Sequence, residues 1–345
     1  MKSRKLLLAL LLIGIVPVVN VTGRIRTRPR RPSRTRVWPQ SPQQTTFAPL
    51  TVENSKEVEF ELGYEFSVPG KTSAIKFVAL LPQTIPGRQK ILDMNYSQEP
   101  ARVFSENQNQ YAEFVFIKPE RRFEVQINIK AELFRYDLST ARDKQAEEMT
   151  FEDADLQEFL KQEKYIEKDH SRIRQIAENI IDPNEIDTVK SIYEYVAEKL
   201  EYGGPADEEL GAVTAVQCKK GDCTEYSDLF VALCRAKDIP ARVATGFTVR
   251  SDDVGPKHHW AEVYLQEYGW VPFEPCWGDV QSAAIRDMAF YTLKPIYIYL
   301  SRIRNDEVLH NNHFYAYTYW GDKVTLADSI EFKHPAEPNS RSQVE

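Results

Sequence analysis

The sequence predicts an α+β protein in which an antiparallel β-sandwich precedes a domain of helices followed by strands. Apolar residues alternate with period two through residues 57–68 and 123–133, and they then recur at helical spacing between residues 173 and 237. Strand patterns return after residue 241. Because these helices precede the strands and do not alternate with them, the second half is expected to be α+β, not a parallel α/β fold.

The amino terminus is predicted to be a targeting segment. The basic start MKSRK is followed by fourteen apolar residues, Leu6 to Val19, a run typical of a signal peptide and short for a membrane span. We therefore predict a signal peptide or membrane anchor over 1–23, with secretion or attachment to the cell envelope. The arginines that follow favour an alternative, an uncleaved anchor with the body of the chain in the cytoplasm.

Charge is distributed unevenly along the chain. Residues 24–48 are predicted to be an Arg/Pro-rich linker, and adhesion to a membrane or another anionic envelope polymer is the second interpretation. Ten of the 44 Lys and Arg residues and none of the 51 acids lie in the first fifty positions, so the remainder carries a formal charge of about −17. Such an acidic body is a poor nucleic-acid binder, and we expect no nucleic-acid partner.

The β-sandwich is predicted over residues 49–140. In the segment 57–68 the apolar side chains take one face and the glutamates the other, and 123–133 repeats this pattern. IKFVALLP (75–82) and YAEFVFI (111–117) fit further strands. No pattern in this domain indicates chemistry.

The second domain is predicted over 150–332, with a disordered tail at 333–345. Amphipathic helices are indicated around residues 173–180, 189–200 and 223–237. Strands are indicated at residues 241–249, 258–265 and 270–275, and a late hairpin is indicated at 315–326.

Cys223 falls at the first turn of the third predicted helix, directly after a Gly-Asp turn. The unpaired N–H groups and the macrodipole of a helix N-terminus favour a thiolate there. A nucleophilic cysteine also needs a base and a group that orients the base. The following strands offer His258 or His259 and then Glu274, and antiparallel pairing of these strands would bring the start of one beside the end of the next.

These motifs resemble a known family. GDCTEYSDLFVALCRAKDIPAR, HHWAEVYL and GWVPFEP, in this order, are similar to the transglutaminase-like superfamily of papain-type cysteine enzymes, over about 170–285. The preceding sandwich resembles the amino-terminal domain of bacterial secreted members. The resemblance implies a helix that carries the nucleophile, Cys223, packed on an antiparallel sheet. It also implies that His258, two residues before the tryptophan, is the catalytic histidine and that Glu274 takes the place of the family's aspartate.

The chain departs from the family pattern at several positions. Glu274 replaces an aspartate, Cys276 a threonine, and Asp238 the glycine that ends the helix. Glutamate can orient an imidazole, and aspartate can adopt the left-handed conformation. His259, on the opposite strand face from His258, is interpreted as a structural histidine. Gln217 has the spacing at which papain-like enzymes place a side-chain oxyanion donor.

The four cysteines leave a disulfide interpretation open. An even number of cysteines in an exported protein favours disulfides, and the alternative for Cys223 is a bridge to Cys218 or Cys276. If one bridge exists, a pairing of Cys218 with Cys276 would leave Cys223 free. Cys234 lies in the middle of a helix and is interpreted as a buried thiol.

Metal sites fit the sequence poorly. A zinc site from Cys218, Cys223, a histidine and Cys276 contains no tight ligand pair. His310 and His313 lie in a polar loop and are interpreted as surface residues. We therefore expect no metal and no cofactor.

Two functions remain open. The first is thiol-dependent acyl transfer on protein or peptide amide bonds, as a cysteine protease or amidase when water is the acceptor or as a transglutaminase when an amine is; hydrolysis is slightly favoured. The second, motivated by the departures from the family pattern, is a catalytically weak or inactive scaffold that acts as an envelope binding protein. The distances among Cys223, His258 and Glu274 discriminate between them.

Overall fold

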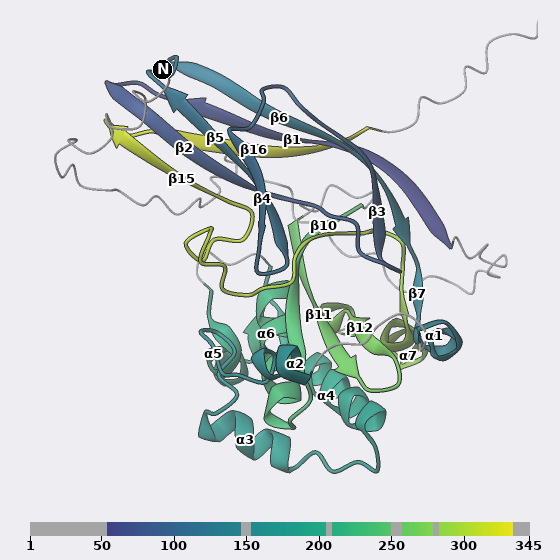
Figure 1. Cartoon of the computed structure of the whole chain (residues 1–345). Coiled ribbons are helices and arrows are strands. Elements are labelled where there is room, and N and C mark those ends of the chain that lie inside the picture. The colour runs from purple at the N-terminus through teal and green to yellow at the C-terminus, as the bar shows by residue number, and fades with distance from the viewer. Residues whose placement is uncertain (1–53, 146–152, 205–208, 250–256, 279–282, 334–345) are drawn as a thin grey trace, which may run out of the picture.

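The computed structural model describes residues 54–145, 153–204, 209–249, 257–278 and 283–333 of the 345-residue chain. The predicted signal peptide or anchor and the predicted linker lie outside these residues, as does nearly all of the predicted tail. Among the described helices, none has the length and apolar character needed to cross a membrane. Figure 1 shows long strands in the upper half of the molecule and a helical half below them.

The upper half is built from two four-stranded antiparallel sheets, ordered β16-β1-β6-β3 and β15-β2-β5-β4. The strands are β1 (Ser55–Ser67), β2 (Thr72–Leu81), β3 (Gln89–Tyr96), β4 (Arg102–Glu106), β5 (Asn109–Ile117), β6 (Arg122–Phe134), β15 (Tyr315–Gly321) and β16 (Thr325–Lys333). The alternation predicted for β1 is confirmed, because Val58, Phe60 and Phe66 are buried. Phe66 meets Phe77 of the other sheet edge-on, with 5.3 Å between the ring centroids.

The carboxyl-terminal strands differ from the prediction. We expected residues 315–326 to form a hairpin within the second domain. Instead β15 pairs with β2 and β16 pairs with β1, so each strand adds to a different sheet of the sandwich. Sequence patterning could not show this, because it marks a strand and its buried face but not its partner.

The lower half has helices packed on an antiparallel sheet ordered β12-β11-β10-β14. The helices are α3 (Ser171–Glu178), α4 (Glu185–Lys199), α5 (Gly211–Cys218), α6 (Cys223–Ala236) and α7 (Ala283–Tyr291), and the sheet strands are β10 (Ala241–Thr248), β11 (Lys257–Leu265), β12 (Gly269–Phe273) and β14 (Tyr297–Ser301). Phe230 of α6 packs on Phe273, which ends β12, with 5.6 Å between the ring centroids. The predicted α+β class is confirmed.

The remaining elements are short. They are β7 (Tyr136–Asp137), α1 (Leu138–Gln145), α2 (Asp153–Glu158), β8 (Glu201–Tyr202), β9 (Lys220–Gly221), β13 (Thr292–Leu293) and a 3₁₀ turn at Pro275–Gly278. Asp238, after α6, has φ of +57°, as expected of a residue standing where the family has glycine.

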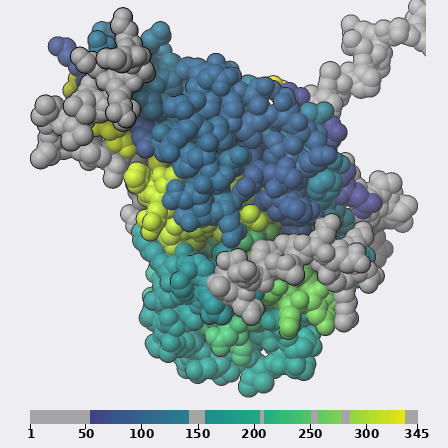
Figure 2. All heavy atoms as spheres, viewed as in Figure 1, coloured from purple at the N-terminus to yellow at the C-terminus, as the bar shows by residue number. Residues whose placement is uncertain are grey.

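The two halves share apolar surface. Phe247 of β10 and Ile298 and Leu300 of β14 belong to the same buried cluster as the sandwich core. In Figure 2 the yellow carboxyl-terminal segment lies between the blue sandwich and the teal helical half. The sheet that carries the candidate site therefore rests against the sandwich on one side and α6 on the other.

Candidate active site

Cys223 is the first residue of α6, and local hydrogen bonds fix this helix end. Asp222 is the N-cap: its Oδ1 accepts a hydrogen bond from the backbone N–H of Thr224 at 2.7 Å. The Glu225 carboxylate accepts one in return from the Asp222 N–H at 2.9 Å, which completes a capping box. The half-buried Cys223 thiol thus lies at the positive end of a well-capped helix.

His258 and Glu274 meet across two neighbouring strands. Because Ala261 of β11 pairs with Phe273 of β12, Glu274 follows on beside the first residues of β11. His258 Nε2 lies 2.5 Å from Glu274 Oε2, and the Glu274 side chain is 3% exposed. The pairing predicted for these strands is therefore observed.

The His258 ring also contacts Cys223. Burial lowers the pKa of His258, but the charges of Glu274 and Cys223, together with hydrogen bonds to both side chains, outweigh burial and raise it to about 10. Since Glu274 occupies Nε2, Nδ1 is the ring nitrogen left for Cys223. The structure thus brings together the three residues that the motifs predicted.

Two tyrosines hold Glu274 in place. The Tyr297 hydroxyl donates to Glu274 Oε2 at 2.9 Å, and the Tyr193 hydroxyl donates to the Glu274 carbonyl at 3.1 Å. The Cys276 N–H donates to Oε1 at 3.2 Å. Sequence reasoning missed both tyrosines, because Tyr297 comes 23 residues after Glu274, in a five-residue strand without an alternating pattern.

His259 occupies the opposite face of β11. Its Nδ1 lies 3.0 Å from Thr245 Oγ1, and its ring meets His313 edge-on at 4.5 Å. Burial, and then the positive charges of His313, Arg304 and His258, lower its pKa well below the usual value. His259 is thus neutral and buried, as the structural interpretation requires.

The interpretation of His313 as a surface residue was wrong. His310 is exposed, but the His313 side chain is only 18% exposed and its Nε2 forms a hydrogen bond with the Glu209 carboxylate. Burial raises the pKa of Glu209, but hydrogen bonding to His313 and the charge of Arg304 outweigh burial and lower the pKa to about 2. A polar loop sequence does not reveal such a pairing, because Glu209 lies 104 residues away.

The other candidate residues lie around the helix start. Gln217 is exposed on the last turn of α5, and its role as an oxyanion donor stays a prediction. All four cysteines are free, so the bridge that the cysteine count left open between Cys218 and Cys276 is not formed. Cys234 is buried, as predicted, and burial raises the pKa of its thiol.

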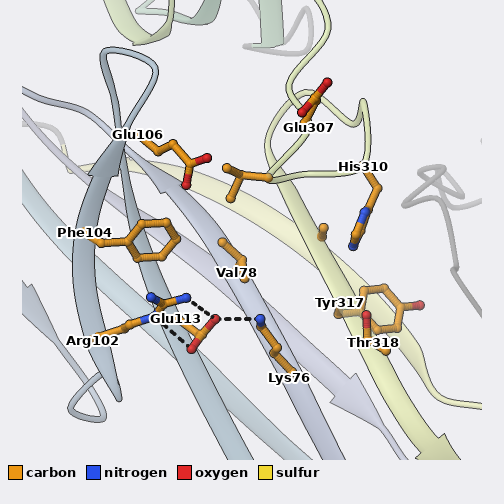
Figure 3. A pocket seen from close by; sticks show the side chains of 12 residues that line it. Lys76, Val78, Arg102, Phe104, Glu106, Glu113, Glu307, His310, Tyr317 and Thr318 are labelled. Carbon is orange, nitrogen blue, oxygen red and sulfur yellow. Dashed lines mark hydrogen bonds and ion pairs between the residues drawn. The ribbon is translucent and has the colours of Figure 1, made fainter. Parts of the chain in front are cut away.

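A separate hollow of about 260 Å³ lies on the outer face of the sandwich, away from Cys223. Figure 3 shows Glu113 between Lys76 and Arg102, with ion-pair distances of 2.8 and 3.0 Å. Glu113 thus neutralises part of the positive charge, and no lining residue is a cysteine. This hollow therefore offers no thiol nucleophile among the described residues.

A cysteine at a helix start, a histidine on a neighbouring strand and a carboxylate at the end of the next strand are the residue types from which a cysteine enzyme builds its nucleophile, its base and the group that orients the base. Residues 174–275, which hold all three, match the family model of the transglutaminase-like superfamily. This part of the chain is a transglutaminase-like domain.

Two curated relatives match shorter parts. The uncharacterized protein YebA of Bacillus subtilis is 35% identical over 85 residues, 21% of this chain and 12% of YebA. An uncharacterized protein of Haemophilus influenzae is 26% identical over 147 residues, 35% of this chain and 40% of that protein. The chain thus spans less than half the length of either relative.

One solved structure extends the likeness to both halves. The crystal structure of a proposed cysteine protease from Cytophaga hutchinsonii has a TM-score of 0.54 and covers 82% of this chain and 94% of that chain. The sequence identity is 16%, so the likeness concerns the fold alone.

Proposed function

We propose that this protein is a thiol-dependent acyl-transfer enzyme that acts on protein or peptide amide bonds. The observation that carries the proposal is the His258 ring, which contacts Cys223 on one side and lies 2.5 Å from the Glu274 carboxylate on the other. In this arrangement Cys223 is the nucleophile, His258 moves the proton and Glu274 orients the imidazole.

The reaction follows from these positions. The Cys223 thiolate attacks the amide carbonyl, and His258 then gives its proton to the departing amine as the C–N bond breaks. Water, or an amine, next attacks the acyl-enzyme and returns a proton to His258, which frees the thiolate. The Cys223 backbone N–H, and Gln217 if its amide turns inward, would stabilise the oxyanion.

Hydrolysis is the preferred branch. Water is always present, whereas transamidation needs a bound amine. The similar structure from Cytophaga hutchinsonii is described as a proposed cysteine protease, which agrees with hydrolysis. The basic and apolar start of the chain supports export to the cell envelope.

The test is the rate of iodoacetamide alkylation at each cysteine between pH 5 and 9, resolved by peptide mass spectrometry. We expect Cys223 to react fast well below pH 8, and His258→Ala to slow it by about tenfold or more at pH 6. The exposed Cys218 is an internal control whose rate should not change. His259→Gln is the matched histidine control and should leave the Cys223 rate within about threefold of the wild type, because His259 lies on the opposite strand face.

Activity is tested next. Peptide and protein substrates incubated with and without a primary amine separate hydrolysis from transfer, with Cys223→Ala as the inactive control. A Cys223 rate that matches Cys218 at every pH and ignores His258→Ala would overturn the proposal and favour the binding scaffold.

A further inference from the structure

Tyr297 is the residue through which β14 reaches the candidate site. It is the first residue of β14, is 5% exposed, and its hydroxyl donates to Glu274 Oε2 at 2.9 Å. The same oxygen lies 2.5 Å from His258 Nε2. We propose that Tyr297 is a positioning residue that holds Glu274 in the one orientation from which it can orient His258; this rests on the proposed function.

The glutamate makes such a partner necessary. Where the family pattern has aspartate, Glu274 has one more methylene and one more rotatable bond, so its carboxylate has more orientations available. The carboxylate is also buried, and a buried carboxylate is costly unless donors satisfy it. Tyr297 supplies a donor to Oε2 and the Cys276 N–H supplies one to Oε1, so both oxygens are fixed.

The ring of Tyr297 is itself held by the site. It packs edge-on against Trp260 at 5.1 Å and lies 6.1 Å from the His258 ring, measured between centroids. Trp260 is fully buried, so the Tyr297 ring that packs against it cannot shift without disturbing the sheet. The hydroxyl is therefore presented to Glu274 from a rigid element, as precise positioning of a catalytic group requires.

Tyr193 does not share this role. Its hydroxyl reaches the backbone carbonyl of Glu274, so it fixes where the residue lies but not how the carboxylate points. Only Tyr297 and the Cys276 N–H contact the carboxylate besides His258, among the hydrogen bonds of the described residues.

The experiment is Tyr297→Phe, assayed by Cys223 alkylation across the pH range. Phenylalanine keeps the ring and its packing and removes only the hydroxyl. We expect the Cys223 rate at pH 6 to fall by about tenfold, because loss of a hydrogen bond to a charged buried group weakens the orientation of His258. The acid limb of the pH profile should move to higher pH, a change that a purely structural loss would not produce.

Tyr299→Phe is the matched control. Tyr299 lies two residues further along β14, is buried, and packs edge-on against the same Trp260 at 4.7 Å. No hydrogen bond between its hydroxyl and Glu274 occurs in the described structure. We expect this variant to keep the wild-type pH profile, and melting curves of both variants to show that each is folded.

A double-mutant cycle with Glu274→Ala separates the outcomes. If Tyr297 acts through Glu274, Tyr297→Phe should change the rate less than about twofold once the carboxylate is gone. The positioning role would be overturned if Tyr297→Phe lowered the Cys223 alkylation rate equally in the Glu274→Ala variant and in the wild type. It would also be overturned if the pH profiles of Tyr297→Phe and Tyr299→Phe were identical. The proposed function would survive either result, and it would fail only if His258→Ala also left the Cys223 rate unchanged.

Discussion

His258 and His259 are adjacent residues with opposite protonation. Each faces a different side of β11, so Glu274 and Cys223 surround one ring while His313 and Arg304 surround the other. The pKa of His258 is raised to about 10 and that of His259 falls well below its ordinary value, and burial opposes the charged form of both. Neighbouring charge, not burial, therefore decides which histidine is an imidazolium.

This origin of the shift predicts how the His258 pKa responds to the loss of the thiol. The negative charge of Cys223 and its hydrogen bond both raise the pKa of His258, so Cys223→Ala should lower it from about 10. The measurement is an NMR titration of the His258 ring protons. Cys218→Ala, which removes an exposed thiol, is the control and should leave the titration unchanged. An unaltered His258 pKa in Cys223→Ala would show that thiol and imidazole are not coupled.

The sequence was sufficient to predict which three residues meet at the candidate site but not which residues hold them there. Cys223, His258 and Glu274 fall in motifs with fixed spacing, and strand pairing then explains why they meet. Tyr193 and Tyr297 lie 81 and 23 residues from Glu274, in segments whose patterns indicate only burial. Contacts of this kind depend on tertiary packing, which a single sequence does not show.

At the scale of elements, a close approach of β14 to β10 places Tyr297. A side-chain Cβ at Gly246 of β10 would lie 1.8 Å from the carbonyl oxygen of Ile298. The register between β10 and β14 also shifts between Thr245 and Gly246. Gly246 therefore permits β10 and β14 to approach more closely than a residue with a side chain would allow.

We predict that Gly246→Ala destabilises the protein by about 1–3 kcal/mol, because the backbone of β14 must move away. The Cys223 rate should fall as well, since Tyr297 moves with its strand. Urea unfolding measures the loss of stability, and alkylation measures the fall in the Cys223 rate. Gly203→Ala is the control: its Cβ would meet only the flexible side chain of Lys220, so stability should change by less than about 1 kcal/mol. Equal effects of the two substitutions would contradict this account of Gly246.

Long amphipathic elements were predictable and short buried ones were not. β1 and β6 alternate over thirteen residues each, and α4 and α6 keep an apolar stripe. β14 is fully buried over five residues, and β3 has one buried residue among eight, so neither shows a period. The helix α5 begins at Gly211 without a side-chain cap, which removes the usual start signal.

At the scale of the whole molecule, the last two described strands pair with the first two. Strands β15 and β16 return to the amino-terminal sheets, so the sandwich is not continuous in sequence, whereas the elements of the lower half follow one another from α3 to β14. Lys257, next to His258, is ion-paired with Asp328 of β16, and Tyr315 donates to the same carboxylate at 3.1 Å. The strand that carries the candidate histidine is thus anchored to the sandwich.

This topology predicts that the sandwich cannot fold without the carboxyl-terminal strands. In a chain that stops at Phe314, β1 and β2 each lose a neighbouring strand, and Tyr64 and Phe77 lose their ring contacts with Tyr315. Exposing this apolar surface should yield an aggregating protein, or one that binds a hydrophobic dye and lacks a cooperative melting transition. A chain that stops at residue 333 keeps both strands and should melt like the full chain. If the chain ending at Phe314 instead melted cooperatively at the temperature of the full chain, the sandwich would be an independent unit, as the sequence alone had indicated.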